Sequence, residues 1–453
     1  MAMDRTPSVW IAQRHGQDWR DEETLAAIAW MTRSLDQNAW CARLEAVREK
    51  FYLGRRAWQQ GDRVALFDHR DLAAWYVFQA NAYAADRRDW YEPEAYRIAP
   101  VFRRIGQLLP ELSVISGAEE RAVRLLTEGR QQPDDGIYEL LVAAAYQRNG
   151  WEQVGFVPEE PGRRKTHDLN VVSGRRRWAV ECKRVGRSEY SANERSHGER
   201  LAAPIHALSR TGQLSAIVEV DFRVELSKVS TEYLAEHAER ASCAAGATQW
   251  DDEVSRGRIR SVAWTDLRPV LSSDDLYFGS SRMIQLAASS YVAEADHSVD
   301  GDWTPSRLRP FHARDVTRLS VVSWLSSSHE AARRKAKHFR AMIAKAARQL
   351  PGDRPGVVHV GYELVGGNGA DARRDLTNRL ELVSFNVGES RLRYVYGNYM
   401  VPEHVTAANE SAALTATTAT YPIRGVRTPD PLPNHSLFSD GPILPGGYWL
   451  RSL

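Results

Sequence analysis

Three charged residues near the middle of the chain, Asp168, Glu181 and Lys183, are of types that bind a divalent metal and stabilise developing negative charge. Glu181 and Lys183 lie two residues apart in the stretch WAVECKRV at 178–185, whose other members are mostly apolar. A strand of this composition normally excludes charge, because a buried ion is costly unless it is paired or binds a metal. These charges therefore need a partner.

A short hairpin brings the three residues together. Gly174 followed by Arg175 suits a two-residue type II′ turn between strands at 168–173 and 176–185. With this turn, Asp168 is expected to face Glu181 across the hairpin. Side chains alternate along a strand, so Asp168, Glu181 and Lys183 are expected on one face of the sheet.

Two carboxylates at directly opposed positions, with Cβ atoms about 4.5–5.5 Å apart, repel each other unless a cation lies between them. Oxygen ligands of this kind suit Mg²⁺, which typically takes one or two carboxylates together with water and phosphate oxygens. The ammonium group of Lys183 could then position a metal-associated water or balance charge on a phosphate. The alternative is a cross-strand salt ladder with no chemistry.

The hairpin also concentrates positive charge. The whole chain has 60 Lys plus Arg against 58 Asp plus Glu, a net charge of +2, yet residues 163–187 contain only two acidic residues, Asp168 and Glu181. The basic residues of this segment are Arg163, Arg164, Lys165, Arg175, Arg176, Arg177, Lys183, Arg184 and Arg187. Such a cluster suits a polyanion, and the alternative is a solvated hairpin tip.

This arrangement resembles the PD-(D/E)xK restriction-endonuclease-like nuclease superfamily: an Asp, about a dozen residues, then Glu-x-Lys in the second hairpin strand, preceded by a helix with a Glu. The resemblance covers about 118–225, with 329–400 as an extension. It implies Mg²⁺, which Mn²⁺ can replace, bound by Asp168, Glu181 and the backbone carbonyl of Cys182. It implies Lys183 as the catalytic lysine and Glu139 as the helix carboxylate. His167 stands where the family has Pro.

The elements around the hairpin predict an α/β fold, a mixed sheet flanked by helices with a restriction-endonuclease-like core, after an N-terminal α-helical domain. The predicted segments are a helical domain at 1–115, the nuclease core at 116–226, an insertion or accessory subdomain at 227–310, a helix and strands completing or extending the core at 311–400, and an Ala/Thr- and Pro-rich C-terminal segment at 401–453. We expect a hairpin with its turn at Gly388, and the C-terminal segment extended over the surface.

Two helices bear on the site. The helix that begins near Asp134 is apolar nearly all round, so Glu139 either reaches the sheet or complements the helix dipole near its first turn. The helix from His329 is rich in Lys and Arg along one side. Arg333, Arg334 and Lys337 are its candidate phosphate contacts, and the alternative is a solvated face whose basic stems cover the core.

Other classes of protein find little support in the sequence. Cys41, Cys182 and Cys243 are far apart and form no CxxC pair, so neither a disulfide framework nor a zinc module is expected. The start of the chain has no apolar signal region and no run approaches 18 apolar residues, so we expect a cytoplasmic protein without membrane partners.

Three hypotheses remain open at this level. The first is a Mg²⁺-dependent endonuclease acting on DNA, with RNA as an alternative substrate, in bacterial defence, restriction or repair. The second is a non-cleaving nucleic-acid-binding or sensing module with a degenerate nuclease fold. The third is an interaction protein with a salt ladder in the hairpin. A homodimer and partner subunits of a defence complex are both compatible with the first hypothesis.

Overall fold

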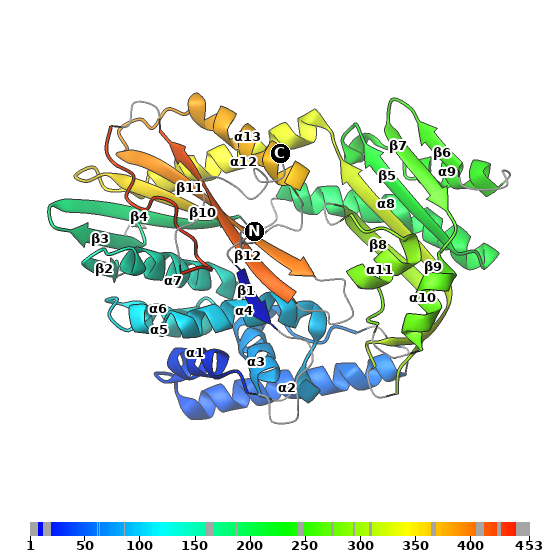
Figure 1. The fold of residues 1–453 in the computed structure, drawn as a ribbon, viewed down its shortest axis with the longest axis horizontal. Coiled ribbons are helices and arrows are strands. Elements are labelled where there is room, and N and C mark those ends of the chain that lie inside the picture. The colour runs from blue at the N-terminus through cyan, green and yellow to red at the C-terminus, as the bar shows by residue number, and fades with distance from the viewer. Residues whose placement is uncertain are drawn as a thin grey trace, which may run out of the picture.

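The computed structural model describes residues 8–11, 20–60, 62, 64–85, 87–158, 166–185, 189–242, 248–272, 276–292, 295–307, 310–363, 368–404, 412–423 and 427–440. They form a mixed α/β structure with two mixed sheets, each flanked by helices, and an N-terminal helical region (Figure 1). The predicted α/β class and the helical N-terminal region are thus confirmed. No helix in these ranges is both long enough and apolar enough to cross a membrane.

The first sheet has seven strands and contains the predicted hairpin. Its parallel centre is formed by three strands, and antiparallel strands lie on both sides. In spatial order the strands are β1 (Ser8–Ile11), β12 (Ala412–Pro422), β11 (Leu392–His404), β10 (Gly356–Glu363), β4 (Arg176–Val185), β3 (Leu169–Ser173) and β2 (Gln153–Phe156). The parallel set is β4, β10 and β11, so β4 is an interior strand.

Helices cover both faces of this sheet (Figure 1). One face packs on α7 (Pro133–Arg148) and, beyond it, on the N-terminal helices; the other packs on α12 (His329–Ala347) and α13 (Asn368–Val383). The remaining helices of the first face are α1 (Glu22–Thr32), α2 (Gln37–Gln59), α3 (Leu72–Ala84), α4 (Glu92–Gln107), α5 (Leu109–Leu112) and α6 (Ala118–Leu126). Aromatic residues of the N-terminal helices fill this core.

The second sheet has five strands in the order β6, β7, β5, β9, β8. Its strands are β5 (Ala216–Phe222), β6 (Thr248–Asp251), β7 (Ser255–Arg260), β8 (Asp296–Pro305) and β9 (Ala313–Ser326). Helices α8 (Glu189–Gly212) and α9 (Tyr233–Ser242) pack on one face, and α10 (Trp264–Leu271) and α11 (Ser281–Ala288) pack on the other. This unit lies on the opposite side of the molecule from the hairpin tip (Figure 1).

β5 lies within the segment 116–226 that was predicted to form a single core with the hairpin, but it does not join the hairpin's sheet. β5 pairs with β7 and β9 in the second sheet, and the strand beside β4 is β10. The physical reason is the length of α8, whose 24 residues carry the chain about 36 Å from the end of β4. The segment between β4 and β10 in the first sheet therefore contains the whole second sheet.

Two further expectations were wrong. The segment ending at Val383, predicted as the first strand of a hairpin, forms the last turns of α13, where Leu382 packs into the core beside α12. Residues 412–422, predicted as a surface segment, form β12, which pairs with β11 and β1 and buries Leu414 and Tyr421. Thr is common in strands, so this Ala/Thr-rich composition suits a buried strand.

Two buried histidines make stability depend on pH. Burial lowers the pKa of His206 and of His435 to about 4. His435 accepts a hydrogen bond at Nε2 from Asn398 and donates from Nδ1 to the Leu432 carbonyl, so it is neutral in the fold. The unfolded chain, with a His pKa near 6.5, binds these protons more tightly than the native protein does.

We therefore expect stability to be full above about pH 6.5 and to fall as pH drops toward 4. The contribution lost per histidine at pH 5 is about 2 kcal/mol. Urea unfolding at pH 7.5 and pH 5 measures the change, and His435→Gln should show a smaller difference between the two pH values. An unchanged difference in that variant would contradict the assignment.

Candidate metal and nucleic-acid site

The hairpin has the register that the sequence predicts. Ser173 pairs with Arg176 and Val171 with Trp178, so Gly174 and Arg175 are the two loop residues. Gly174 has φ of +56°, and Arg175 is not among the residues with positive φ, as a type II′ turn requires. Both strands end close to their predicted limits.

The ladder changes at Asp168. Leu169 pairs with Val180, but the N–H of Asp168 also donates to the carbonyl of Val180 at 3.0 Å, so two residues face one, as in a β-bulge. The predicted pairing of Asp168 with Glu181 is therefore not part of the ladder, which ends at Leu169 and Val180. The Oδ2 of Asp168 accepts a hydrogen bond of 2.7 Å from the N–H of Cys182, on the edge of β4 that faces β3.

Glu181 and Lys183 share a face of β4, as predicted. Ala179 and Val185, at the same alternation, pack toward α12 and α13, whereas Trp178 and Cys182 pack toward α7. The Lys183 ammonium contacts the Glu181 carboxylate and lies 3.3 Å from the carbonyl oxygen of Cys182. Hence the peptide groups of Cys182 link Asp168 and Lys183.

Both carboxylates are removed from solvent: Glu181 is 0% and Asp168 is 3% exposed. Burial alone would lower the pKa of Lys183, but the charges of Glu181 and Asp168 outweigh it and raise the pKa. Burial and the charges of Asp168, Glu139 and Glu181 raise the pKa of the Cys182 thiol well above its usual value. The thiol is therefore neutral, and the ionic chemistry of the site belongs to the carboxylates and the lysine.

The oxygen atoms around Lys183 include some of the ligands expected for a hard cation. Among the described residues, no three His, Cys, Asp or Glu side chains gather closely enough to hold a metal ion. The Lys183 ammonium, however, lies against a carboxylate oxygen of Glu181 and the Cys182 carbonyl, two of the oxygen ligands expected for Mg²⁺. Two carboxylates and one carbonyl are compatible with Mg²⁺, which usually keeps several waters.

Glu139 lies apart from this pair. It belongs to α7, on the face of the sheet toward which Cys182 points, and Arg121 of α6 pairs with it at 2.9 Å. Its charge contributes to the raised pKa of Cys182, so it lies near β4 but on the side opposite to Glu181 and Lys183. Glu139 is thus held by an arginine that sequence reasoning did not pair with it.

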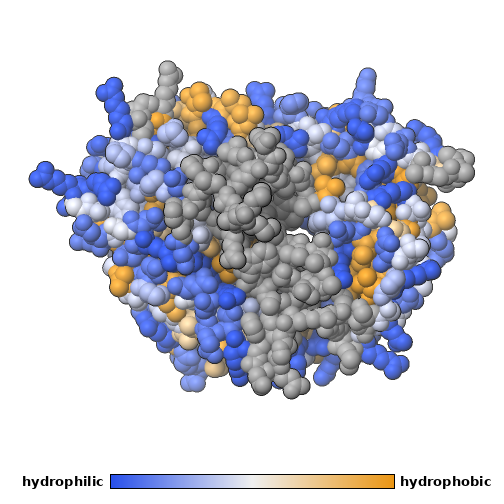
Figure 2. Space-filling model, in the orientation of Figure 1, coloured by the Kyte–Doolittle hydropathy of each residue, from blue (hydrophilic) through white to orange (hydrophobic). Residues whose placement is uncertain are grey.

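The predicted nucleic-acid contacts fall into three groups. Arg163, Arg164, Lys165 and Arg187 lie outside the described residues. Arg175, Arg176 and Arg177 are exposed at the hairpin tip, in a part of the visible surface that is largely hydrophilic (Figure 2). Arg184 is almost buried and forms an ion pair of 2.7 Å with Asp134.

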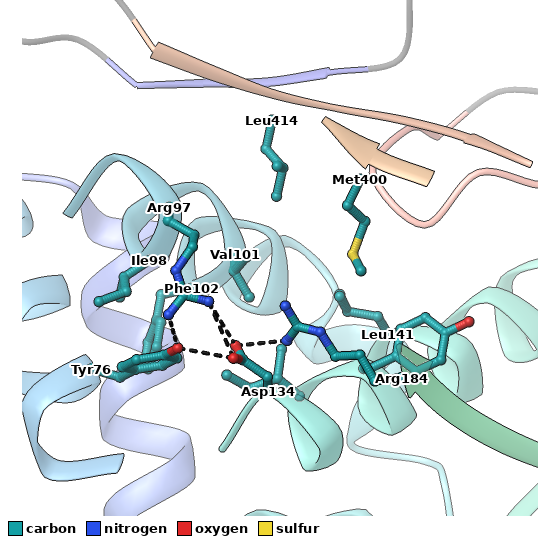
Figure 3. Close-up of a pocket in the computed structure, with 12 residues that line it drawn as sticks. Tyr76, Arg97, Ile98, Val101, Phe102, Asp134, Leu141, Arg184, Met400 and Leu414 are labelled. Carbon is teal, nitrogen blue, oxygen red and sulfur yellow. Dashed lines mark hydrogen bonds and ion pairs between the residues drawn. The ribbon is translucent and has the colours of Figure 1, made fainter. Parts of the chain in front are cut away.

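The Arg184 ion pair belongs to a network at the start of α7 (Figure 3). Asp134 also pairs with Arg97 at 3.1 Å and accepts a hydrogen bond of 3.0 Å from the Tyr76 hydroxyl. Burial would raise the pKa of Asp134, but Arg184 and Arg97 outweigh it and lower the pKa. The network joins α3, α4, α7 and β4 beside a small apolar cavity lined by Met400 and Leu414. Arg184 therefore has a structural role here.

The basic helix α12 shows a mixed result. Arg333 and Lys337 are exposed, whereas Arg334 pairs with Glu225 at 3.2 Å and with Glu330 at 3.5 Å. The opposite side of α12 packs through Phe339 and related residues into the core. The helix thus has a packed side and an exposed basic side, and its phosphate contacts stay a prediction.

Sequence reasoning missed the Asp134 network. The run Pro133, Asp134, Asp135 is typical of a helix start, and no local signal points to Arg97, which lies 37 residues away from Asp134. Comparisons of the chain with protein-family models, with curated proteins and with solved structures found no match. Function must therefore be argued from the geometry of the hairpin site.

Proposed function

We propose that the protein is a Mg²⁺-dependent nuclease that hydrolyses phosphodiester bonds in DNA, with a restriction-endonuclease-like core around the hairpin. The observation that carries the proposal is the Cys182 peptide. Its N–H holds the buried Asp168 carboxylate, and its carbonyl and the Glu181 carboxylate both contact Lys183. Two carboxylates, a carbonyl and a lysine thus lie around the peptide of Cys182, beside the start of β3.

Each residue has a defined role in this proposal. Mg²⁺, when bound, would neutralise the phosphate and supply a nucleophilic water. Asp168 and Glu181 would hold the ion together with the Cys182 carbonyl. Lys183, whose raised pKa keeps it protonated, would move from its contacts with these oxygens to the scissile phosphate and stabilise charge there.

Metal dependence tests the proposal. Supercoiled plasmid and linear DNA are incubated with the full-length protein in Mg²⁺ or in EDTA, beside Glu181→Ala and Lys183→Ala. We expect cleavage only with Mg²⁺ and the wild-type chain. Equal cutting by the wild type and both variants, or cutting in EDTA, would refute the proposal. The same assay with single- and double-stranded RNA decides the class of substrate.

The hairpin tip should contribute to affinity. Each arginine that contacts a phosphate steepens the dependence of the logarithm of the DNA association constant on the logarithm of salt concentration by about 0.9. Replacing Arg175, Arg176 and Arg177 together with Ala should lower that slope by about 2–3. The unfolding free energy should fall by no more than about 1 kcal/mol, because all three are exposed and Arg176 adds one contact, 5.1 Å from the Trp151 ring centroid. Fluorescence anisotropy at several salt concentrations measures the slope.

Arg184→Ala is the matched control for the tip variant. It removes one arginine from the same strand, but this arginine is held by Asp134. We expect it to lower stability and to leave the salt slope unchanged. A slope that falls equally in both variants would contradict the division between the exposed tip and the buried network.

A non-cleaving nucleic-acid-binding module is the second candidate, favoured by one observation: Glu139 pairs with Arg121 and lies away from Glu181 and Lys183. The same assays separate the two candidates. Salt-sensitive DNA binding that survives Asp168→Ala, without any metal-dependent product, would favour the second. A role in bacterial defence, restriction or repair in the cytoplasm, alone or with partner subunits, accompanies the first.

A further inference from the structure

The second sheet has an open cavity that the hairpin site does not use. Its volume is about 310 Å³, at the lower end of cavities that bind small molecules. All five strands contribute to its floor, and the end of α11 with the segment after it forms a wall that includes Ala288, Val292 and Ala295. The cavity lies on the face of the sheet that α10 and α11 cover only in part.

A polar row crosses the whole floor. Strand pairing places its members side by side, one from each strand: Gln249, Arg258, Glu219, Ser323 and His297. Within the row, Glu219 is fixed by Arg258 and by Arg260 at 3.0 Å, and Ser290 donates to it at 3.3 Å. Burial lowers the pKa of His297 to about 4, so at neutral pH it offers one donor or acceptor without charge.

The next row of the floor contains an unsatisfied acceptor. Asp221 faces Arg256 on β7 and Leu325 on β9. Its Oδ1 is buried, and no hydrogen bond to it is formed by the residues that the structure describes. A buried acceptor without a donor is destabilising relative to one that is hydrogen-bonded. A ligand that brings N–H groups to this oxygen would recover that free energy, while Leu325 and Val292 offer apolar contact.

We propose that this cavity binds a single nucleobase, with the Asp221 carboxylate accepting hydrogen bonds from the N–H groups of the base. Guanine is the preferred base, because its ring N–H and its amino group are adjacent donors that one carboxylate can accept together. The side chain of Arg256, on the neighbouring strand, suits the acceptor atoms O6 and N7 of guanine. The choice of a nucleobase rests on the proposed function, and the base would enter from a single strand or unstacked from a duplex.

Nucleotide binding to the full-length protein tests this assignment. GMP, AMP, CMP and UMP are titrated by isothermal calorimetry without Mg²⁺, so that failure here is separate from failure of cleavage. We expect GMP to bind most tightly and Asp221→Asn to weaken it at least tenfold. Glu253→Gln, which removes an exposed carboxylate from the neighbouring turn, is the control and should bind as the wild type does.

A second variant keeps the test decisive if Asp221→Asn folds poorly by circular dichroism. Leu325→Trp fills the cavity from its floor and should also abolish GMP binding. A guanine-containing single-stranded oligonucleotide that binds more tightly than GMP, with the same loss in both variants, identifies a base within a strand as the ligand. No binding of GMP or of the oligonucleotide, or equal binding by wild type and both variants, would overturn the proposal.

Discussion

Asp168→Asn is expected to reduce Mg²⁺-dependent cleavage at least a hundredfold and to change the free energy of unfolding by less than about 1 kcal/mol. The structure permits this separation of activity from stability because Asp168 provides both a hydrogen-bond acceptor and a negative charge. Its Oδ2 accepts the Cys182 N–H at 2.7 Å, and an asparagine oxygen can accept the same hydrogen bond. Only the negative charge is lost, and charge is what a bound divalent ion requires. Cleavage assays and urea unfolding on the same preparations measure both effects.

Asp168→Ala is the matched comparison. It removes the charge and the hydrogen bond together, so the N–H of Cys182, a buried residue, loses its acceptor. We expect the same loss of cleavage with an additional destabilisation of about 1–3 kcal/mol. Wild-type cleavage by Asp168→Asn would show that the carboxylate serves only to hold the end of the hairpin. The salt-ladder reading of the hairpin instead predicts no cleavage by the wild type or by either variant.

The local part of the site could be predicted from the sequence because it depends on short-range geometry. A Gly-Arg turn fixes the register of two adjacent strands, and alternation then puts Glu181 and Lys183 on one face. The bulge at Asp168 could not be predicted, because it depends on which carbonyl of β4 accepts the hydrogen bond from the Asp168 N–H. The pattern of residues in the hairpin does not determine which carbonyl accepts this hydrogen bond.

The long-range part was beyond sequence reasoning. The strand after the hairpin, β5, looks like any buried parallel strand, and nothing in its own residues tells which sheet it joins. Glu139 illustrates the same limit for a side chain. Its helix was correctly predicted as buried on both sides, but its orientation toward Arg121 depends on how α6 packs, 18 residues earlier in the chain.

The sheet that supports the site is held by a buried polar network centred on Asn398 of β11. Asn398 accepts hydrogen bonds from the Tyr138 hydroxyl at 2.6 Å and from His359 at 3.2 Å. It donates to Thr418 at 2.9 Å and to His435 at 3.1 Å. These partners come from α7, β10, β12 and the segment after β12, so one side chain joins elements that are far apart in the sequence. His359 also pairs with Cys182 in the strand register.

Asn398→Leu should therefore destabilise the fold by about 3–5 kcal/mol, since it leaves several buried donors and acceptors without partners at once. Asn149→Leu, at the exposed end of α7 where the Asn149 side chain bonds only the Ala145 carbonyl among the described residues, should cost less than about 1 kcal/mol. Urea unfolding of both variants measures the difference. Because β10 lies between β11 and β4, the first variant should also lose Mg²⁺-dependent cleavage at temperatures where the second retains it. Equal stability of the two variants would mean that the network is not a determinant of the sheet's stability, and the positions of Asp168 and Glu181 would then depend on apolar packing against α7 and α12 alone.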